Sequence, residues 1–99
     1  MLNFSDHYAD MENGLRTLLS AVAGQFSASD IAEVEEFIEA REYGLALQTL
    51  AAILLETSTH LDGQVIDKIQ ELAGAMDIHN DDAINGVVAA SHRQFRVAL

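Results

Sequence analysis

The chain contains no cysteine and no proline, and only six of its 99 residues are glycine. The absence of cysteine excludes disulfide bonds and zinc sites with thiolate ligands. β-Sandwiches and barrels form most of their turns with proline and glycine, so the scarcity of both favours helices joined by short polar connections. Aromatic residues make up only 6% of the chain. A core would therefore consist mainly of Leu, Ile, Val and Ala.

Basic residues are also few, because five Lys and Arg stand against 16 acidic residues, for a formal net charge of -11 at pH 7. Such a charge repels nucleic acids and anionic membranes and attracts basic proteins, although it also serves solubility alone. The N-terminus shows no signal peptide, and the most apolar run, 45–55, is too short to span a bilayer. We therefore expect a cytoplasmic protein that binds neither nucleic acid nor membrane.

Five segments of the chain have apolar residues at steps of three and four. This spacing predicts helices over about 6–23, 27–41, 45–56 and 62–76, and a last helix that begins after Asn80. Apolar residues lie on nearly all sides of 45–56, which is typical of a helix inside a bundle. The sequence predicts a single all-α domain, 1–99: a compact bundle of about five helices around a buried central helix, 45–56.

Two helix starts and one break have signals of their own. Ser27 is followed three residues later by Asp30, a pattern that resembles a capping box with Asp in place of Glu or Gln. Asn80 is the expected cap of the last helix, and two aspartates follow it, at 81–82, where the helix dipole favours anions. The apolar pattern is interrupted at 43–44, so we expect the second and third helices to be separated there.

No residues have the spacing of a known catalytic or metal site. The four histidines, His7, His60, His79 and His92, include no His-Glu-x-x-His pair. There is no glycine-rich phosphate loop and no nucleophile elbow. Catalytic carboxylates need a cleft that separates their pKa values, whereas the grouped glutamates of this chain lie on a predicted solvent side. We expect no enzyme, no metal and no cofactor.

A phosphopantetheine carrier protein is one alternative class, because such proteins are small, acidic and helical. They hold the attachment serine in an Asp-Ser-Leu-type motif at the start of the second helix. The corresponding stretch here, 27–31, reads Ser-Ala-Ser-Asp-Ile. A serine does precede an acidic helix, but the order of the residues differs, and mass spectrometry for the added arm would separate the two classes.

Acidic residues are concentrated on the second predicted helix. Asp30 and five glutamates lie between positions 30 and 42, where Arg41 is the only base. The five are Glu33, Glu35, Glu36, Glu39 and Glu42, and the last of them is expected to share a helix face with Glu35 and Glu39. Like charges this close repel one another unless a basic partner compensates them. These glutamates are the predicted binding surface, and a solvated face without a partner is the open alternative.

Tyr43 follows this acidic stretch at the expected helix junction. Aromatic residues at such positions are often hot spots of protein interfaces. Tyr43 is therefore the sixth predicted contact residue. Packing between the second and third helices is its alternative role.

The segment 37–50, which reads Phe-Ile-Glu-Ala-Arg-Glu-Tyr-Gly-Leu-Ala-Leu-Gln-Thr-Leu, resembles the central motif of Maf-type immunity proteins. In that family an acidic helix ends in a glycine-containing turn, and an Ala-Leu-x-x-Leu helix follows. The resemblance covers roughly residues 30–78, and Arg41 stands where glycine is more usual. It is carried by Glu42, Tyr43, Gly44, Ala46, Leu47, Leu50 and Leu54, and more weakly by Ile66, Ile69, Leu72 and Ala73.

Membership of this family would imply an antitoxin that neutralises a toxin delivered by a neighbouring bacterium, as in contact-dependent growth inhibition. Several such toxins are RNases, among them ones similar to EndoU nucleases. We expect a monomer that forms a heterodimer with a basic nuclease toxin and covers the toxin's RNA-binding face with the acidic helix. The alternative is an acidic helical adaptor or regulatory subunit without a toxin partner, and an upstream toxin gene would favour the first.

Overall fold

The computed structural model describes residues 4–57, 61–78 and 80–97, with the side chains of residues 8–57, 61–78 and 80–93. In these ranges the chain forms five α-helices, one short 3-10 helix and no strand. The elements are α1 (Phe4–Val22), η1 (Ala23–Gln25), α2 (Ala28–Glu39), α3 (Tyr43–Thr57), α4 (Gly63–Ala75) and α5 (Asp82–Val97). The predicted all-α fold is confirmed.

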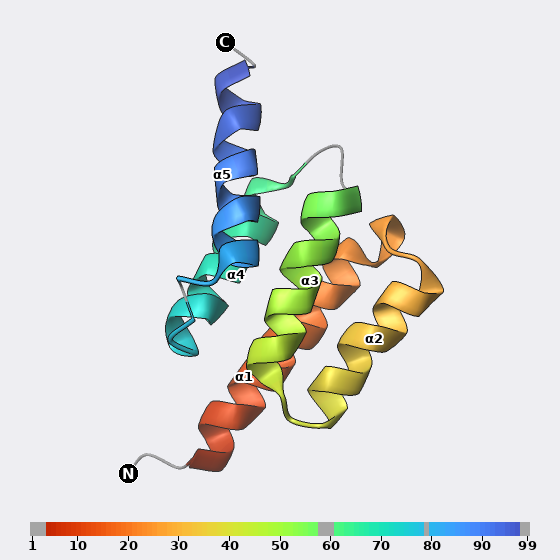
Figure 1. Cartoon of the computed structure of the whole chain (residues 1–99). Helices are drawn as coiled ribbons and strands as arrows, with labels where there is room; N and C mark the ends of the chain where they lie inside the picture. The colour runs from red at the N-terminus through yellow and green to blue at the C-terminus, as the bar shows by residue number, and fades with distance from the viewer. Residues whose placement is uncertain (1–3, 58–60, 79, 98–99) are drawn as a thin grey trace.

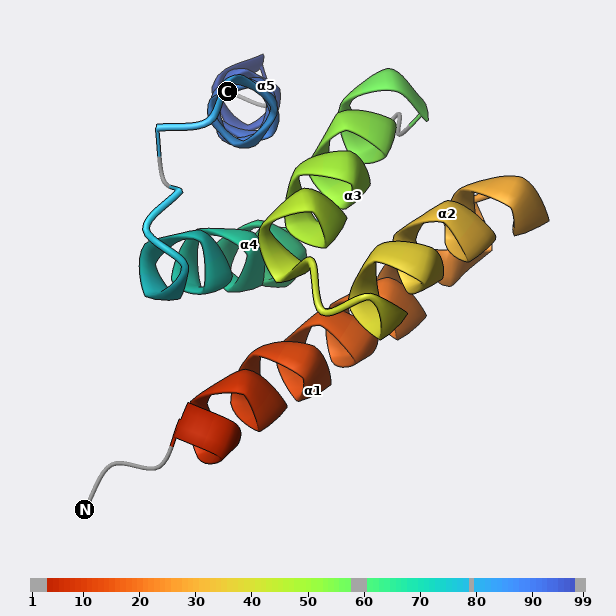
Figure 2. The same ribbon diagram turned by 60° about the horizontal axis from the view of Figure 1, so that its bottom comes forward.

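The helices lie in two layers around α3. Helices α2, α3 and α5 face the viewer in Figure 1, while α1 and α4 pass behind them, and the turned view in Figure 2 shows the same separation. Helix α3 packs against each of the other four helices. The predicted central position of this helix is therefore confirmed. The C-terminal half of α5 extends beyond the end of α3 (Figure 1).

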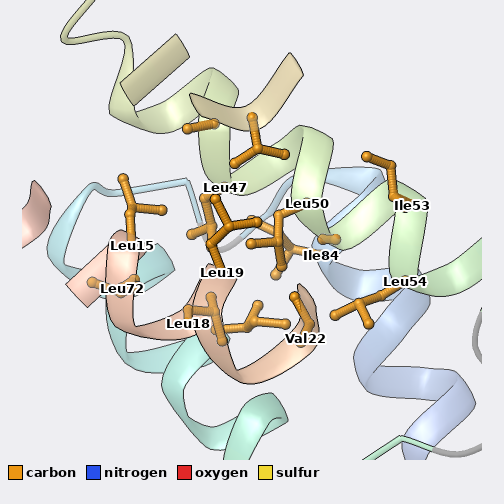
Figure 3. Packing of buried hydrophobic residues seen from close by; sticks show 14 of the residues in the cluster. Leu15, Leu18, Leu19, Val22, Leu47, Leu50, Ile53, Leu54, Leu72 and Ile84 are labelled. Carbon is orange, nitrogen blue, oxygen red and sulfur yellow. The ribbon is translucent and has the colours of Figure 1, made fainter. Parts of the chain in front are cut away.

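The core is built from aliphatic side chains that the helical spacing brings to one side of each helix. Figure 3 shows leucines of α1 and α3 meeting Leu72 of α4 and Ile84 of α5. Leu15, Leu47 and Leu50 are completely buried. Burying a side chain of this kind contributes about 1.5–3 kcal/mol, so this cluster holds the two layers together.

The outward side of α3 departs from the prediction of a wholly buried helix. Leu45 is 46% exposed and Leu55 is 41% exposed, although both are large and apolar. The reason is the two-layer arrangement, since α3 has neighbours behind it and on both flanks but no helix in front (Figure 1).

The expected cap of α2 is confirmed, and that of α5 is corrected. Ser27 Oγ accepts a 3.0 Å hydrogen bond from the Asp30 amide, while the Asp30 carboxylate accepts one from the Ser27 amide, which completes the capping box. At α5 the cap is Asp81 and not Asn80. The Asp81 carboxylate accepts hydrogen bonds of 2.9 and 3.2 Å from the amides of Ala83 and Ile84.

Helix α2 ends in a left-handed turn at Arg41, whose φ is 62°. The Arg41 amide donates to the Ile38 carbonyl and the Glu42 amide donates to the Phe37 carbonyl, the bonding pattern of a Schellman motif. Arg41 thus occupies the position that glycine usually takes. The predicted break at 43–44 is wrong, because the chain leaves α2 earlier and Tyr43 already begins α3.

Candidate protein-binding surface

All five predicted contact glutamates are exposed. Helix α2 turns Val34 and Ile38 into the core, which leaves the opposite side of the helix to solvent. Four of the glutamates lie on this solvent side of α2, and the fifth follows the helix; they are Glu33, Glu35, Glu36, Glu39 and Glu42. We call these five residues the acidic surface.

Glu42 does not continue the helix face of Glu35 and Glu39, which corrects the prediction that these three residues share one face. Helix α2 ends at Glu39, and the left-handed turn at Arg41 redirects the chain. The Glu42 carbonyl accepts a 2.9 Å hydrogen bond from the Ala46 amide, so Glu42 directly precedes α3. Its carboxylate therefore lies at the positive end of a different helix, where an anion is favoured.

The acidic surface is not neutralised by the described part of the chain. The two ion pairs seen there use other acids, joining Arg16 to Glu12 at 3.2 Å and Lys68 to Glu71 at 3.4 Å. Within α2 the glutamates instead face one another at spacings of three and four, as in Glu33–Glu36. Each like-charged pair of this kind costs about 0.2–0.5 kcal/mol, so the helix tolerates the repulsion and presents a negative potential to solvent.

The glutamates of α2 divide between its two flanks. Glu35 lines a shallow groove together with Ile31 of α2 and with Arg16 and Leu19 of α1. Positions two residues apart point to opposite sides of an α-helix, so Glu33 lies on the other flank, next to α3. Glu39 is four residues after Glu35 and returns to the α1 flank. A partner can therefore approach α2 along α1 or along α3.

Tyr43 is part of the core and offers little surface to a partner. Only 6% of it is exposed, and its hydroxyl donates a 3.0 Å hydrogen bond to Glu12 Oε1 on α1. Its ring centroid lies 6.3 Å from that of Tyr8 in a tilted arrangement. The interpretation of Tyr43 as a contact residue does not fit this burial. The observed role of Tyr43 is packing, and its contacts are with residues of α1.

Glu12 is the residue of this cluster that the sequence analysis missed. Its other oxygen, Oε2, accepts the 3.2 Å bond from Arg16 Nε. The hydrogen bond from Arg16, followed by that from Tyr43, lowers the pKa of Glu12 below 4.5, and partial burial opposes them. Burial, with a smaller contribution from the bond to Glu12, raises the pKa of Tyr43 above 10.0. The Glu12–Arg16 spacing was visible in the sequence, but the Tyr43 contact spans two helices and was not.

The described residues contain no candidate metal site. No group of three His, Cys, Asp or Glu side chains in these ranges is close enough to hold a metal ion. His92 is exposed, while His60, His79 and the side chain of His7 lie outside the described residues. A groove of about 530 Å³ between α1 and α4 is lined in part by Lys68 and Glu71.

Among the described residues, no helix is long and apolar enough to cross a membrane. Comparisons with models of known protein families, with characterised proteins and with solved structures give no match. The resemblance to Maf-type immunity proteins therefore stays a prediction.

Proposed function

We propose that this protein is an immunity protein, which binds a basic bacterial toxin through the acidic surface and thereby blocks it. The observation that carries the proposal is the set of five exposed glutamates that no Lys or Arg of the described chain neutralises. The resemblance of residues 37–50 to Maf-type immunity proteins supports a bacterial toxin, and an RNase in particular, as the basic partner. An RNase toxin must grip phosphates and so has a basic face for these glutamates to cover.

The proposed mechanism is steric and electrostatic. Long-range attraction between the acidic surface and the basic face speeds the encounter, and the bound helix then excludes RNA from the toxin. No cofactor, metal or covalent step is involved. The complex is a heterodimer formed in the cytoplasm, and its affinity falls as salt screens the charges.

The experiment is co-expression with the product of the neighbouring gene, followed by measurement of cell growth. We expect the wild-type chain to protect the cells and a variant with Glu33→Lys, Glu36→Lys and Glu39→Lys to protect them less. Arg93 lies on α5, away from the acidic surface, so an Arg93→Gln variant is the control and should protect fully. Thermal unfolding shows whether each variant is folded. Full protection by a folded triple lysine variant would exclude the acidic surface.

The alternative is an acidic helical adaptor whose basic partner is not a toxin. It would give a salt-sensitive complex with another protein and no protection from the neighbouring gene product. The growth assay and the binding assay together separate the two functions.

A further inference from the structure

Helix α3 has a second row of residues suited to packing against a helix, on its outward side. Leu45, Gln48, Ala52 and Leu55 follow one another at steps of three, four and three. This is the spacing with which one helix packs along another, as at the a and d positions of a coiled coil. We call these four residues the α3 seam.

The α3 seam is open to solvent. Leu45 is 46% exposed and Leu55 is 41% exposed, while Gln48 and Ala52 are partly exposed. Neither leucine belongs to the buried core, which α3 builds from other residues. The exposed parts of Leu45 and Leu55 thus form a packing surface that the described chain does not cover.

Helix α5 has small residues where it lies beside the α3 seam. A Cβ atom added to Gly86 would lie 2.9 Å from Leu55 Cδ2, so the Leu55 side chain packs against α5 where α5 has no side chain of its own. Ala90, one turn further along α5, is also small and partly buried. Leu55 is therefore held in place by α5 while 41% of its surface stays exposed.

Acidic residues border the α3 seam. Glu42 precedes α3 and lies three residues before Leu45, and Glu56 directly follows Leu55; both glutamates are exposed. Glu33 lies on the α2 flank that faces α3. The border is therefore mostly negative, and its apolar centre is about 15 Å long at 1.5 Å per residue.

These charges select the occupant. A second copy of the chain would carry another net charge of -11 and bring like charges together around the leucines. A basic helix instead places its own leucines between Leu45 and Leu55 and its Lys or Arg side chains at the bordering glutamates. We propose that the α3 seam, with Glu33, Glu42 and Glu56, docks an amphipathic helix of a basic protein partner.

This inference rests on the proposed function and makes it narrower. It assigns the contact to the α3 flank of α2, where Glu33 lies, and not to the α1 flank with Glu35 and Glu39. Stable protein interfaces bury about 800 Å² on each partner, which is more than the α3 seam alone provides. The docked helix therefore also touches α2 and α5.

The test uses two synthetic peptides of about 18 residues, long enough to form helix. The first has leucines at steps of three and four with lysines beside them, and the second has the same composition in scrambled order. Each is titrated into the full isotope-labelled chain, and NMR follows the amides. We expect the patterned peptide to bind about ten-fold more tightly than the scrambled one and to shift the amides of the α3 seam, because only it offers an aligned apolar anchor.

Variants then separate the two flanks. Leu45→Gln should remove most of the advantage of the patterned peptide without affecting the scrambled one. Glu33→Gln with Glu42→Gln should weaken binding more than the matched pair Glu35→Gln with Glu39→Gln. Because all five residues are exposed, we expect each variant to fold, and thermal unfolding checks this.

Three results would overturn the inference. Equal binding of both peptides, with no effect of Leu45→Gln, would reject the α3 seam and leave the acidic surface and the proposed function intact. Binding of neither peptide even at low salt would reject the inference and remove the electrostatic basis of the proposed function. Sedimentation as a dimer that Leu45→Arg dissociates would show that a second copy occupies the seam.

Discussion

The hydroxyl of Tyr43 donates a 3.0 Å hydrogen bond to Glu12 Oε1, which links the first residue of α3 to α1 across 31 positions of the chain. The same carboxylate accepts a bond from Arg16 through its other oxygen. This contact fixes the start of α3 on α1. It thereby sets the position of Glu42, and of Leu45 one turn later, at the end of the acidic surface.

Removing the Tyr43 hydroxyl should weaken this link while leaving the core filled. We expect Tyr43→Phe to lower Tm by a few degrees near neutral pH, because the ring stays buried and only the hydrogen bond is lost. Tyr43→Ala should cost more, about 3–5 kcal/mol for a large buried ring. Thermal unfolding by circular dichroism measures both. A Phe variant as stable as the wild type would show that the hydroxyl contributes nothing.

Because the pKa of Tyr43 is raised, the stability of the fold should depend on pH in alkaline solution. Its stabilising contribution is complete below 10.0 and is lost as the pH rises through the raised folded-state pKa. The wild type should therefore lose its advantage over Tyr43→Phe in strongly alkaline solution. A constant difference between the two variants up to that pH would contradict the assignment.

Glu12 should titrate below 4.5 in the folded protein. Arg16→Gln should raise its pKa more than Tyr43→Phe does, since the Arg16 hydrogen bond is the larger cause. Because the folded-state pKa is depressed, Glu12 stabilises the fold above 4.5, and this stabilisation is lost as the pH falls through the folded-state value. NMR titration of the side-chain carboxyl carbon gives the pKa directly. A Glu12 pKa that is not lowered, or that rises more in Tyr43→Phe than in Arg16→Gln, would refute this order of causes.

The left-handed turn at Arg41 should be improved by glycine. Arg41 has φ 62°, a conformation that glycine adopts without a steric penalty. We expect Arg41→Gly to raise the free energy of unfolding by about 0.5–1 kcal/mol. Arg41→Ala is the matched control, since it removes the same charge but keeps the strain. Urea unfolding that gives both variants equal stability would argue against a strained turn.

Two leucines of α3 should lose very different amounts of stability when each is replaced by alanine. Leu50 is completely buried, so Leu50→Ala should cost about 2–5 kcal/mol. Leu45, five residues earlier, is 46% exposed, so Leu45→Ala should cost less than about 1 kcal/mol. Urea unfolding of both variants measures the difference. A large loss of stability at Leu45 would mean that this leucine serves the fold and not a partner.

Local signals in the sequence predicted most of the fold. The capping box at Ser27 and the steps of three and four in each helix depend only on nearby residues, and the structure confirms both. The cap of α5 was misplaced by one residue, because Asn80 and Asp81 are both good caps and only the folded turn selects Asp81. The end of α2 was predicted near Arg41 but lies at Glu39, because Arg41 makes the left-handed turn, a conformation that arginine rarely takes.

The candidate surface was only partly predictable. The acidic residues follow directly from their density on α2, and all five are exposed. The interpretation of Tyr43 did not fit, because its burial depends on Glu12 and Tyr8 from α1, which no local pattern indicates. The apolar residues on nearly all sides of 45–56 suggested a wholly buried helix, although Leu45 and Leu55 are 46% and 41% exposed. Only the two-layer packing shows that this side of α3 is open.

The central claim, that the acidic surface recognises a basic toxin, is tested most directly by isothermal titration calorimetry with the product of the neighbouring gene. The titration compares the wild type with a variant in which Glu33, Glu36, Glu39 and Glu42 are replaced by Gln, at low and at physiological salt. We predict that the wild type binds the toxin at least about ten-fold more tightly at low salt than at physiological salt. The variant should lose most of this salt dependence. Equal affinity of the two proteins at both salt concentrations would contradict the account.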